Sequence, residues 1–435
     1  MSNKTPPTSV LSVNAGSSSL KLQIFVIPKN NDISKPKLLL KASISKLTSP
    51  PAEFTFKNTE SDKYAIESQT LEKDINSVDD AFHLILEHLK KDESGFGAPK
   101  LDQITHVCHR VVHGGELGVQ GPLVINHSVV KELEELTTLA PLHNGPAISV
   151  LKATSTSLKN ATNIVFFDSS FHASLPDFIR TYPIDQKVAK ERKLRKYGFH
   201  GLSYQWILKN TARFLGKDVK ETSIIALHLG SGASMCAIKN GESYDTSMGL
   251  TPLEGLPGGS RSGTIDPSLI FHFTTHPSTT DQTPASIELS HAENILNSSS
   301  GFKSLTSTSD FSQILATNPP TQETTLTINI FLDRILNFFG AYWLKLNGGK
   351  GGVDAVVFSG GIGEGSPKFR KMIVDGFDGL NGGFDELVDG RNNNEDGEET
   401  VYSIGDGGGK VRLLVCKADE ELQMVEECLA DTKLW

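Results

Sequence analysis

The same short pattern occurs twice in this chain, about half its length apart, and it restricts the folds open to the sequence. Residues 10–24 read VLSVNAGSSSLKLQI, and residues 224–238 read IIALHLGSGASMCAI. Each consists of an apolar strand pattern, a turn rich in Gly and Ser, and a second strand with alternating apolar residues. The alignment pairs Asn14 with His228, Gly16 with Gly230 and Ser17 with Ser231. Two such copies predict a duplicated α/β architecture with one ligand-facing loop in each half.

Loops of this type suit an anionic ligand. Glycine lets the backbone approach a ligand closely, and backbone N–H and Ser hydroxyl groups can donate hydrogen bonds to its oxygens. Each loop taken alone also matches an ordinary polar hairpin turn, and chance similarity of two hairpins is the alternative to duplication.

A third glycine segment lies at residues 353–373, VDAVVFSGGIGEGSPKFRKMI. We expect a strand from Ala355 to Phe358, a glycine turn, and a helix that starts near Ser366 and Pro367. A strand, glycine turn and helix N-terminus together form a potential anion or nucleotide site. The spacing of the glycines matches neither the P-loop nor the Rossmann fingerprint.

Composition narrows the class of protein. A length of 435 residues predicts two or three domains. With 51 acidic and 42 basic residues, the chain offers no electrostatic reason to bind nucleic acid or an anionic membrane. Its four cysteines have no CxxC spacing, which disfavours a disulfide framework or a zinc site. Without a signal peptide or membrane-span pattern, we expect a cytoplasmic protein.

Two helices and two loops are expected between the glycine segments. Apolar residues at helical spacing predict helices at 78–91 and 325–347. The segments 274–287 and 389–410 are expected to be surface loops, the second interrupted by a short VYSI strand.

Five further stretches concentrate His, Arg and Asp beside Gly: 109–116, 140–147, 165–176, 195–203 and 246–267. Arginine suits two-point contact with phosphate or carboxylate, and Arg110 and Arg261 both lie in such stretches. Phosphoryl transfer needs little more than cationic groups, a metal and in-line geometry. The alternatives are that His113 and His143 are satisfied core imidazoles, and that Arg110 pairs with a structural carboxylate.

Eight motifs, taken in order, resemble the acetate kinase family within the acetate and sugar kinase, heat-shock chaperone ATPase and actin superfamily. They are NAGSSSLK, HRVVHGGE, APLHN, RKYGFHG, HLGSGAS, TPLEGL, GSRSGTIDP and SGGIGEG. The resemblance extends from about residue 10 to residue 425. It implies a duplicated ribonuclease H-like, actin-like α/β fold with two lobes, mixed sheets flanked by helices, and a central cleft. The implied lobes are residues 1–168 with 418–435, and residues 169–417, the second binding the nucleotide.

The implied activity is reversible, direct in-line phosphoryl transfer from ATP to acetate, which gives acetyl phosphate and ADP with Mg²⁺ as cofactor. A homodimer is also implied, with acetate and ATP as the small-molecule substrates. Acetate is already ionised at pH 7, so we expect the family's catalytic aspartate to position other groups rather than remove a proton.

The resemblance also implies roles for individual residues. The implied catalytic residues are Arg110, which also binds substrate, Asp168, His200 and Arg261. The implied metal-associated residues are Asn14 and Glu420. The implied pocket for the acetate methyl group comprises Val112, Leu142, Phe199 and Pro252. The implied nucleotide site comprises Ser17, Lys21, His228, Leu229, Gly230, Ser231, Gly232, Asp310, Gly361, Ile362, Gly363, Glu364 and Gly365.

Four positions depart from the usual family pattern. Ser231 replaces an asparagine, Ser312 replaces an arginine, Gly365 replaces an asparagine, and Gly258 stands where many members have methionine. Three of the four fall at the implied nucleotide site. Pyrophosphate therefore stays open as an alternative donor, propionate as an alternative acceptor, and a non-catalytic, actin-like nucleotide switch as an alternative function.

Overall fold

The computed structural model describes most of the chain. The described residues are 8–16, 18–27, 36–47, 51–59, 61–71, 75, 77–91, 101–137, 141–274, 285–350, 352–380, 382–388 and 399–434. Among them, no helix combines the length and the apolar character needed to cross a lipid bilayer.

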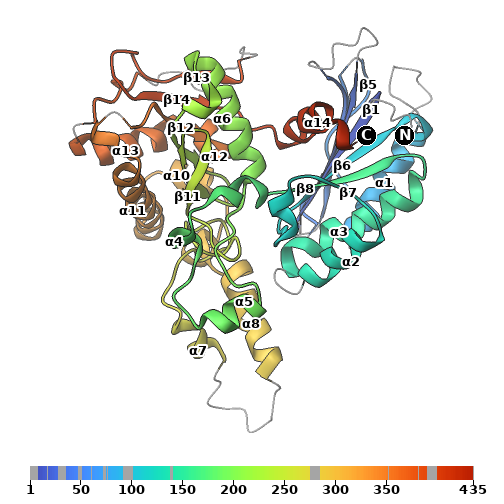
Figure 1. Cartoon of the computed structure of the whole chain (residues 1–435), viewed down its shortest axis with the longest axis horizontal. Coiled ribbons are helices and arrows are strands. Elements are labelled where there is room, and N and C mark those ends of the chain that lie inside the picture. Colours follow the sequence, from blue (N-terminus) through green and yellow to red (C-terminus); the bar gives the residue numbers. More distant parts are fainter. Residues whose placement is uncertain are drawn as a thin grey trace. The chain divides into compact units, whose positions relative to one another are not determined.

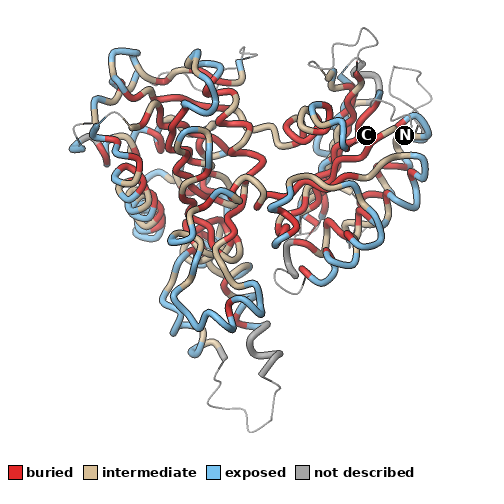
Figure 2. Tube along the Cα trace, in the orientation of Figure 1, coloured by how far each residue is buried: buried red, intermediate tan, exposed pale blue. Residues whose placement is uncertain are grey.

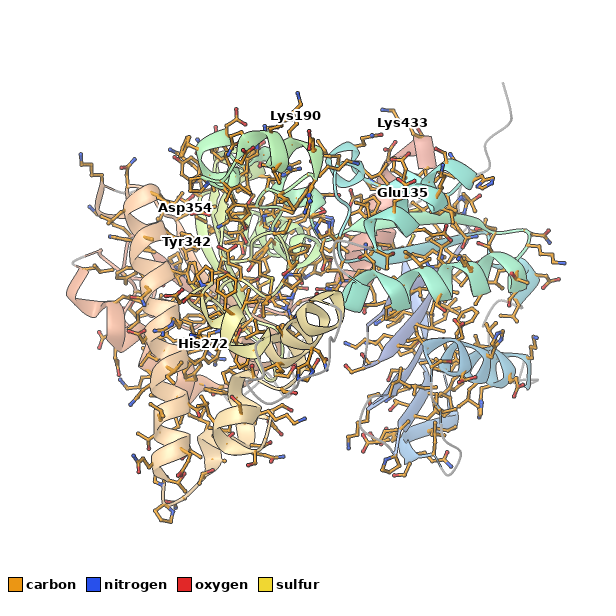
Figure 3. All side chains as sticks on the ribbon, turned by 90° about the horizontal axis from the view of Figure 1, so that it is seen from below. Glu135, Lys190, His272, Tyr342, Asp354 and Lys433 are labelled. Atoms are coloured by element: carbon orange, nitrogen blue, oxygen red, sulfur yellow. The ribbon has the colours of Figure 1, made fainter. Side chains whose placement is uncertain are left out.

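The chain divides into two compact units, each with its own sheet (Figure 1). Unit 1 comprises Met1–Ser170 and Asp419–Trp435, and unit 2 comprises Phe171–Ala418. The strands of both sheets are mostly buried (Figure 2). Charged side chains such as Glu135, Lys190 and Lys433 are exposed (Figure 3).

Unit 1 is built on an eight-stranded mixed sheet in the order β5-β4-β3-β2-β1-β6-β8-β7. Its strands are β1 (Ser9–Ala15), β2 (Leu20–Val26), β3 (Lys37–Ser45), β4 (Glu53–Asn58), β5 (Ser61–Thr70), β6 (His106–Val111), β7 (Leu123–Val124) and β8 (Thr162–Phe167). Its helices are α1 (Val78–Lys91), α2 (His127–Leu136), α3 (Pro141–Ser157) and α14 (Glu420–Ala430).

The helices of unit 1 cover both faces of this sheet (Figure 1). Val107 of β6 shares a hydrophobic cluster with residues of α1 and α3. The next residue, Cys108, interacts with Cys428 of α14. Because successive strand residues point to opposite faces, α14 lies on the face opposite α1 and α3.

Unit 2 is built on a six-stranded sheet in the order β11-β10-β9-β12-β14-β13. Its strands are β9 (Ile224–His228), β10 (Ser234–Lys239), β11 (Glu242–Thr246), β12 (Ala355–Ser359), β13 (Val401–Ser403) and β14 (Arg412–Cys416). Its helices are α4 (Asp177–Arg180), α5 (Gln186–Glu191), α6 (Gly201–Leu215), α7 (Leu269–Thr274), α8 (Ala285–Ser298), α9 (Gly301–Thr306), α10 (Phe311–Ala316), α11 (Gln322–Lys345), α12 (Gly360–Gly365) and α13 (Pro367–Phe377).

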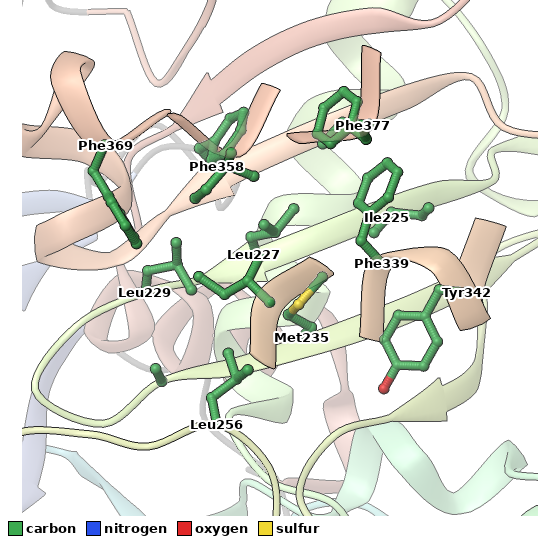
Figure 4. Close-up of a cluster of buried hydrophobic side chains, with 14 of the residues drawn as sticks. Ile225, Leu227, Leu229, Met235, Leu256, Phe339, Tyr342, Phe358, Phe369 and Phe377 are labelled. Atoms are coloured by element: carbon green, nitrogen blue, oxygen red, sulfur yellow. The ribbon is translucent and has the colours of Figure 1, made fainter. Parts of the chain in front are cut away.

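An aromatic-rich core fills one side of the unit 2 sheet (Figure 4). Ile225, Leu227 and Phe358 of the sheet pack there against Phe339 of α11 and Phe369 of α13. Burial of this apolar surface, at about 25 cal/mol per Å², is the main force that holds these helices on the sheet.

The two sheets confirm the predicted duplication. In unit 1, β3-β2-β1 pair antiparallel and β1-β6-β8 pair parallel; β11-β10-β9 and β9-β12-β14 repeat this arrangement in unit 2. Asn14 and His228 occupy equivalent places, since Asn14 lies opposite Arg110 on the next parallel strand and His228 lies opposite Ser359. The two duplicated glycine segments connect paired strands, as expected: the first joins β1 to β2, and the second joins β9 to β10.

The other expected elements can be compared directly. The helix predicted at 78–91 is α1, and the one predicted at 325–347 is α11, which starts three residues earlier because Thr321 caps it. The VYSI strand is β13. Residues 275–284 and 389–398 of the two expected loops lie outside the described residues. The loop prediction is wrong at residues 285–287, because helix α8 already starts at Ala285. The third glycine segment differs from the prediction, because residues 360–365 form the short helix α12 instead of an open turn.

Candidate functional site

Unit 1 gathers charged and amide side chains at one end of its central strands. Asn14 lies near the end of β1, Arg110 near the end of β6, and Asp168 directly after β8. These three strands are parallel neighbours, so their carboxyl ends meet at one edge of the sheet. Glu420 and Glu421 join them from the first turn of α14.

Arg110 is the centre of this cluster. Its Nε and Nη2 donate to the two carboxylate oxygens of Asp168 at 2.9 Å and 2.6 Å, a two-point contact. Its Nη1 donates to Asn14 Oδ1 at 3.0 Å and lies 3.3 Å from Glu420 Oε2. The Asn14 amide donates in turn to Glu420 and, at 3.0 Å, to Glu421. The Asp168 side chain is 1% exposed and that of Arg110 is 18% exposed, so only the arginine reaches solvent appreciably.

The electrostatics of the cluster are dominated by its carboxylates. Burial opposes the charge of Arg110, but Asp168 and Glu420 outweigh burial and raise the pKa of the guanidinium. Burial, together with the charges of Glu421 and Glu420, raises the pKa of Asp419 to about 6, against a backbone hydrogen bond from Leu422 that lowers it. Three carboxylates, those of Asp168, Glu420 and Glu421, act on the one guanidinium of Arg110, so negative charge at this end of unit 1 exceeds what Arg110 neutralises.

The other expected residues of unit 1 are less informative. Val112 is half-buried just after β6, and Lys21 is an exposed residue of β2. Ser17 and the side chain of Leu142 lie outside the described residues, as does the side chain of His143. His113 is completely buried, and its Nδ1 accepts from the Gly115 N–H, as expected of a satisfied core imidazole.

Unit 2 brings a second set of expected residues together around Gly232. A Cβ atom at this glycine would lie 2.7 Å from Arg261 Nη2 and 3.7 Å from His200 Cε1, so both side chains border the same backbone segment. The ring of His200 lies 4.5 Å from that of His228, centroid to centroid. Arg261 Nη1 also donates to the carbonyl of Pro252 at 3.2 Å. Arginine and imidazole donors thus adjoin the glycine turn that follows β9.

His200 is placed by local structure. It caps the N-terminus of α6 in the left-handed conformation, with φ of 59°. The carbonyl of the preceding residue, the fully buried Phe199, accepts from Nε2 of His172 at 3.0 Å. Burial lowers the pKa of His172 to about 4, and its Nδ1 accepts from the Ser243 hydroxyl. A neutral, buried histidine therefore anchors the segment that carries His200.

The glycine segment after β12 packs against the one after β9. The carbonyl of Leu229 accepts from the N–H groups of Ile362 and Gly363 at 2.8 Å and 3.1 Å. Gly360 has φ of 75°, which permits the sharp change from strand to helix. Glu364 accepts from the N–H of Gly360 and from that of Ala418, so its carboxylate has a local structural role.

The remaining expected nucleotide residues differ in exposure. Ser231, Gly361 and Gly365 are exposed, and Gly230 is half-buried. Asp310 is an exposed residue whose side chain accepts from Ser312 N–H at the start of α10. The capping role of Asp310 explains its conformation without a ligand.

Three residues at the two clusters were not predicted from the sequence. Glu421 contacts Asn14, Ser234 contacts His200, and Tyr204 contacts Ser234. The motif HLGSGAS contains Ser234, but no spacing rule indicates that its hydroxyl meets a histidine from another element. Sequence offered no signal for Glu421 beyond its adjacency to Glu420.

Comparison with known proteins identifies relatives across the whole chain. The model of the acetokinase family matches residues 9–426. A probable acetate kinase of Emericella nidulans is 44% identical over 432 residues, which cover 97% of this chain and 98% of that protein. An acetate kinase of Clavibacter michiganensis subsp. michiganensis is 36% identical over 426 residues, which cover 97% of this chain and 99% of that protein.

Two solved structures share the fold over nearly the full length. The acetate kinase of Porphyromonas gingivalis has a TM-score of 0.79 and 29% identity, covering 97% of this chain and 99% of that one. A propionate kinase of Francisella tularensis subsp. tularensis has the same TM-score with 28% identity, covering 97% of this chain and 98% of that one.

Proposed function

The chain belongs to the acetokinase family, and on that premise we propose that it transfers a phosphoryl group reversibly from ATP to the carboxylate of acetate. The products are acetyl phosphate and ADP. The observation that carries this proposal is the two-point contact of Arg110 with Asp168, because it presents a fixed guanidinium at the carboxyl ends of three parallel strands.

Arg110 is the proposed acceptor-binding residue. A guanidinium matches the planar geometry of a carboxylate, and acetate carries the same functional group as the Asp168 side chain that Arg110 already binds. Within unit 1, the half-buried Val112 is proposed to contact the acetate methyl group.

Asp168 is proposed to orient Arg110 instead of acting as a base. A simple carboxylic acid has a pKa of about 4 to 5, so acetate is an anion at pH 7 and has no proton to lose. Both oxygens of Asp168 are engaged by Arg110, which agrees with an orienting role.

Arg261 and His200 are proposed to donate hydrogen bonds to the phosphoryl group as it transfers. Cationic and N–H donors aimed at the equatorial oxygens supply most of the catalysis in such reactions. The side chains of Arg261 and His200 both lie next to Gly232 in the glycine turn, which supports this role. Unit 2 is accordingly the proposed nucleotide-binding lobe, with contacts from the segments 228–232 and 361–365, and unit 1 the acceptor lobe.

A divalent cation, proposed to be Mg²⁺, fits the oxygen donors of unit 1. Among the described residues no group of three or more His, Cys, Asp and Glu side chains forms a preformed metal cage. Mg²⁺ does not require one, since it is commonly held by one or two carboxylates, phosphates and water. The three carboxylates of Asp168, Glu420 and Glu421 around the one guanidinium of Arg110 favour a cation here. Glu420 and Asn14 would hold it, and when bound it would neutralise charge on the donor phosphates.

Trapping of acetyl phosphate by hydroxylamine tests the proposed function. The protein is incubated with acetate, ATP, Mg²⁺ and hydroxylamine, and each component is omitted in turn. We expect acetyl hydroxamate only in the complete mixture. A protein that binds ATP but forms no hydroxamate would instead be a nucleotide switch.

The same assay separates the remaining alternatives. Propionate is the second candidate acceptor, because the propionate kinase structure matches this chain as well as the acetate kinase structure does. One methylene group changes binding by only about 1–3 kcal/mol. Pyrophosphate replaces ATP in a parallel reaction, which tests the changes at Ser231 and Gly365. A cytoplasmic location and a homodimer are further parts of the proposal, and light scattering measures the second.

A further inference from the structure

Two buried hydroxyl groups lie behind the ring of His200. Ser234 Oγ lies 2.8 Å from His200 Nδ1, and the hydroxyl of Tyr204 contacts the same Oγ. Ser234 is the first residue of β10, and Tyr204 belongs to the first turn of α6. Both residues are completely buried, so water does not replace either contact.

The number of protons fixes the direction of these hydrogen bonds. Each hydroxyl has one proton to donate. If Ser234 donated to Tyr204, the Tyr204 proton would have no acceptor among the residues that the structure describes. A buried, unsatisfied donor costs about 1–3 kcal/mol. Burial raises the pKa of Tyr204 well above its usual value, so the phenol keeps its proton and donates it to Ser234.

Ser234 then has its own proton to donate to His200, whose Nδ1 must accept it. An imidazole nitrogen that accepts carries no hydrogen, so the proton of the neutral ring lies on Nε2. We propose that Ser234 and Tyr204 are positioning residues that hold His200 as the neutral Nε2–H tautomer. This inference rests on the proposed function, in which His200 donates to the transferring phosphoryl group.

The arrangement has a clear chemical use. An Nε2–H held in advance donates to an oxygen without rotating the ring or shifting a proton at the moment of reaction. Cε1, which lies between Nδ1 and Nε2 in the ring, is the His200 atom nearest to a Cβ built at Gly232, and Arg261 lies next to the same glycine. A neutral imidazole also avoids adding a second full positive charge beside Arg261.

The tautomer can be measured without any substrate. Full-length protein labelled with ¹⁵N-histidine is studied by two-bond ¹H–¹⁵N NMR correlation at pH 8, and the Nδ1 and Nε2 shifts identify the tautomer of each ring. Comparison with His200→Asn assigns the His200 signals. We expect the Nε2–H form in the wild type and a mixture of both tautomers in Tyr204→Phe and in Ser234→Ala.

Kinetics supply the second readout. Loss of a group that orients a metal-bound histidine typically reduces metal affinity or activity about 10-fold to 100-fold, and we take the same range for His200. We expect that reduction in kcat for both variants, with KM for ATP and acetate changed less than twofold. Tyr342→Phe is the matched control, because Tyr342 is another buried tyrosine of unit 2 and its hydroxyl has no hydrogen-bond partner in the described structure (Figures 3 and 4). It should match the wild type in both measurements.

The outcomes distinguish this inference from the proposed function. Wild-type His200 with its proton on Nδ1 would overturn the inference, as would an unchanged tautomer in both variants. Tyr204→Phe retains every carbon of the side chain, so it tests the inference even if Ser234→Ala fails to fold. If the tautomers behave as expected but the wild type forms no acetyl hydroxamate, the proposed function fails and the positioning role stands.

Discussion

Arg110 binds both carboxylate oxygens of Asp168, with Nε–Oδ1 and Nη2–Oδ2 distances of 2.9 Å and 2.6 Å. The two residues come from neighbouring parallel strands, and the pair leaves Nη1 directed toward Asn14 and Glu420. The orientation of the guanidinium is therefore fixed before any ligand binds. This preorganisation underlies the first two predictions.

Arg110→Lys should weaken binding of acetate. Lysine has a single ammonium group and cannot occupy both oxygens of Asp168 while presenting further N–H groups to a carboxylate. We expect KM for acetate to rise on the order of tenfold or more, with KM for ATP little changed. Steady-state kinetics measure both constants. Arg334→Lys, at an exposed position of α11, is the control and should leave KM for acetate unchanged. If KM for acetate in Arg110→Lys stays within twofold of the wild type, Arg110 does not bind the acceptor.

Asp168→Asn should lower kcat without changing how kcat/KM depends on pH. Asparagine cannot accept from Arg110 with both terminal atoms, so the guanidinium loses its fixed position, and misplacement of about 1 Å can cost on the order of 10²-fold in rate. The profile of kcat/KM against pH should keep its shape in the variant. A basic limb near neutrality that disappears in Asp168→Asn with little other loss would make Asp168 a base, contrary to our account.

Asp419→Asn should stabilise the protein at neutral pH and much less in acid. The pKa of Asp419 in the folded protein is raised to about 6 from a usual value of 3.8, so folding favours its protonated form. Its contribution to stability is present below pH 4 and is lost as pH rises to about 6. A shift of this size corresponds to roughly 2–3 kcal/mol.

Asparagine has no charge to bury and still caps α14, where Asp419 accepts from the Leu422 N–H. Thermal unfolding at pH 4.5 and pH 7.5 measures the effect, and Tm should rise more at pH 7.5. Asp431→Asn, near the end of the same helix, is the control. An equal change in Tm at both pH values would contradict the raised pKa of Asp419.

Gly361→Ala should weaken nucleotide binding while leaving the fold intact. A Cβ atom at Gly361 would meet nothing within 4 Å, so the chain itself has room for alanine. If the backbone of α12 approaches the nucleotide closely, the added methyl group occupies the ligand's place. We expect an unchanged Tm and a KM for ATP raised about tenfold. Gly349→Ala, which is equally unobstructed, is the control; the same KM for ATP in both variants would remove Gly361 from the site.

The sequence was most informative about features that depend on local residue patterns, such as hairpins and strand ends. Alternating apolar residues on both sides of the NAGSSS and LGSGAS segments were sufficient to predict two hairpins and the duplication. Asp168 directly follows the apolar run 164–167, a pattern typical of a residue at a strand end. That this strand end lies beside the one carrying Arg110 is a finding of the structure, because the order of strands in a sheet leaves no local pattern in the sequence.

Contacts between distant elements were not predictable in the same way. The meeting of Tyr204, Ser234 and His200 depends on how α6 packs against the start of β10, and hydroxyl groups leave no periodic pattern. The helical form of residues 360–365 was also missed, because the four glycines in this segment suggested an open turn. There, tertiary hydrogen bonds from Ile362 and Gly363 to Leu229 outweigh the low helix propensity of glycine.

The central claim is that a carboxylate oxygen of acetate becomes bonded to the phosphorus of the transferred group, and isotope labelling tests it. Acetate labelled with ¹⁸O in both carboxylate oxygens is incubated with ATP, Mg²⁺ and the protein, and acetyl phosphate is observed by ³¹P NMR. We predict an acetyl phosphate signal displaced by one ¹⁸O atom bonded to phosphorus. Formation of acetyl phosphate whose phosphorus carries no ¹⁸O, or ATP binding with no acetyl phosphate at all, would contradict the account.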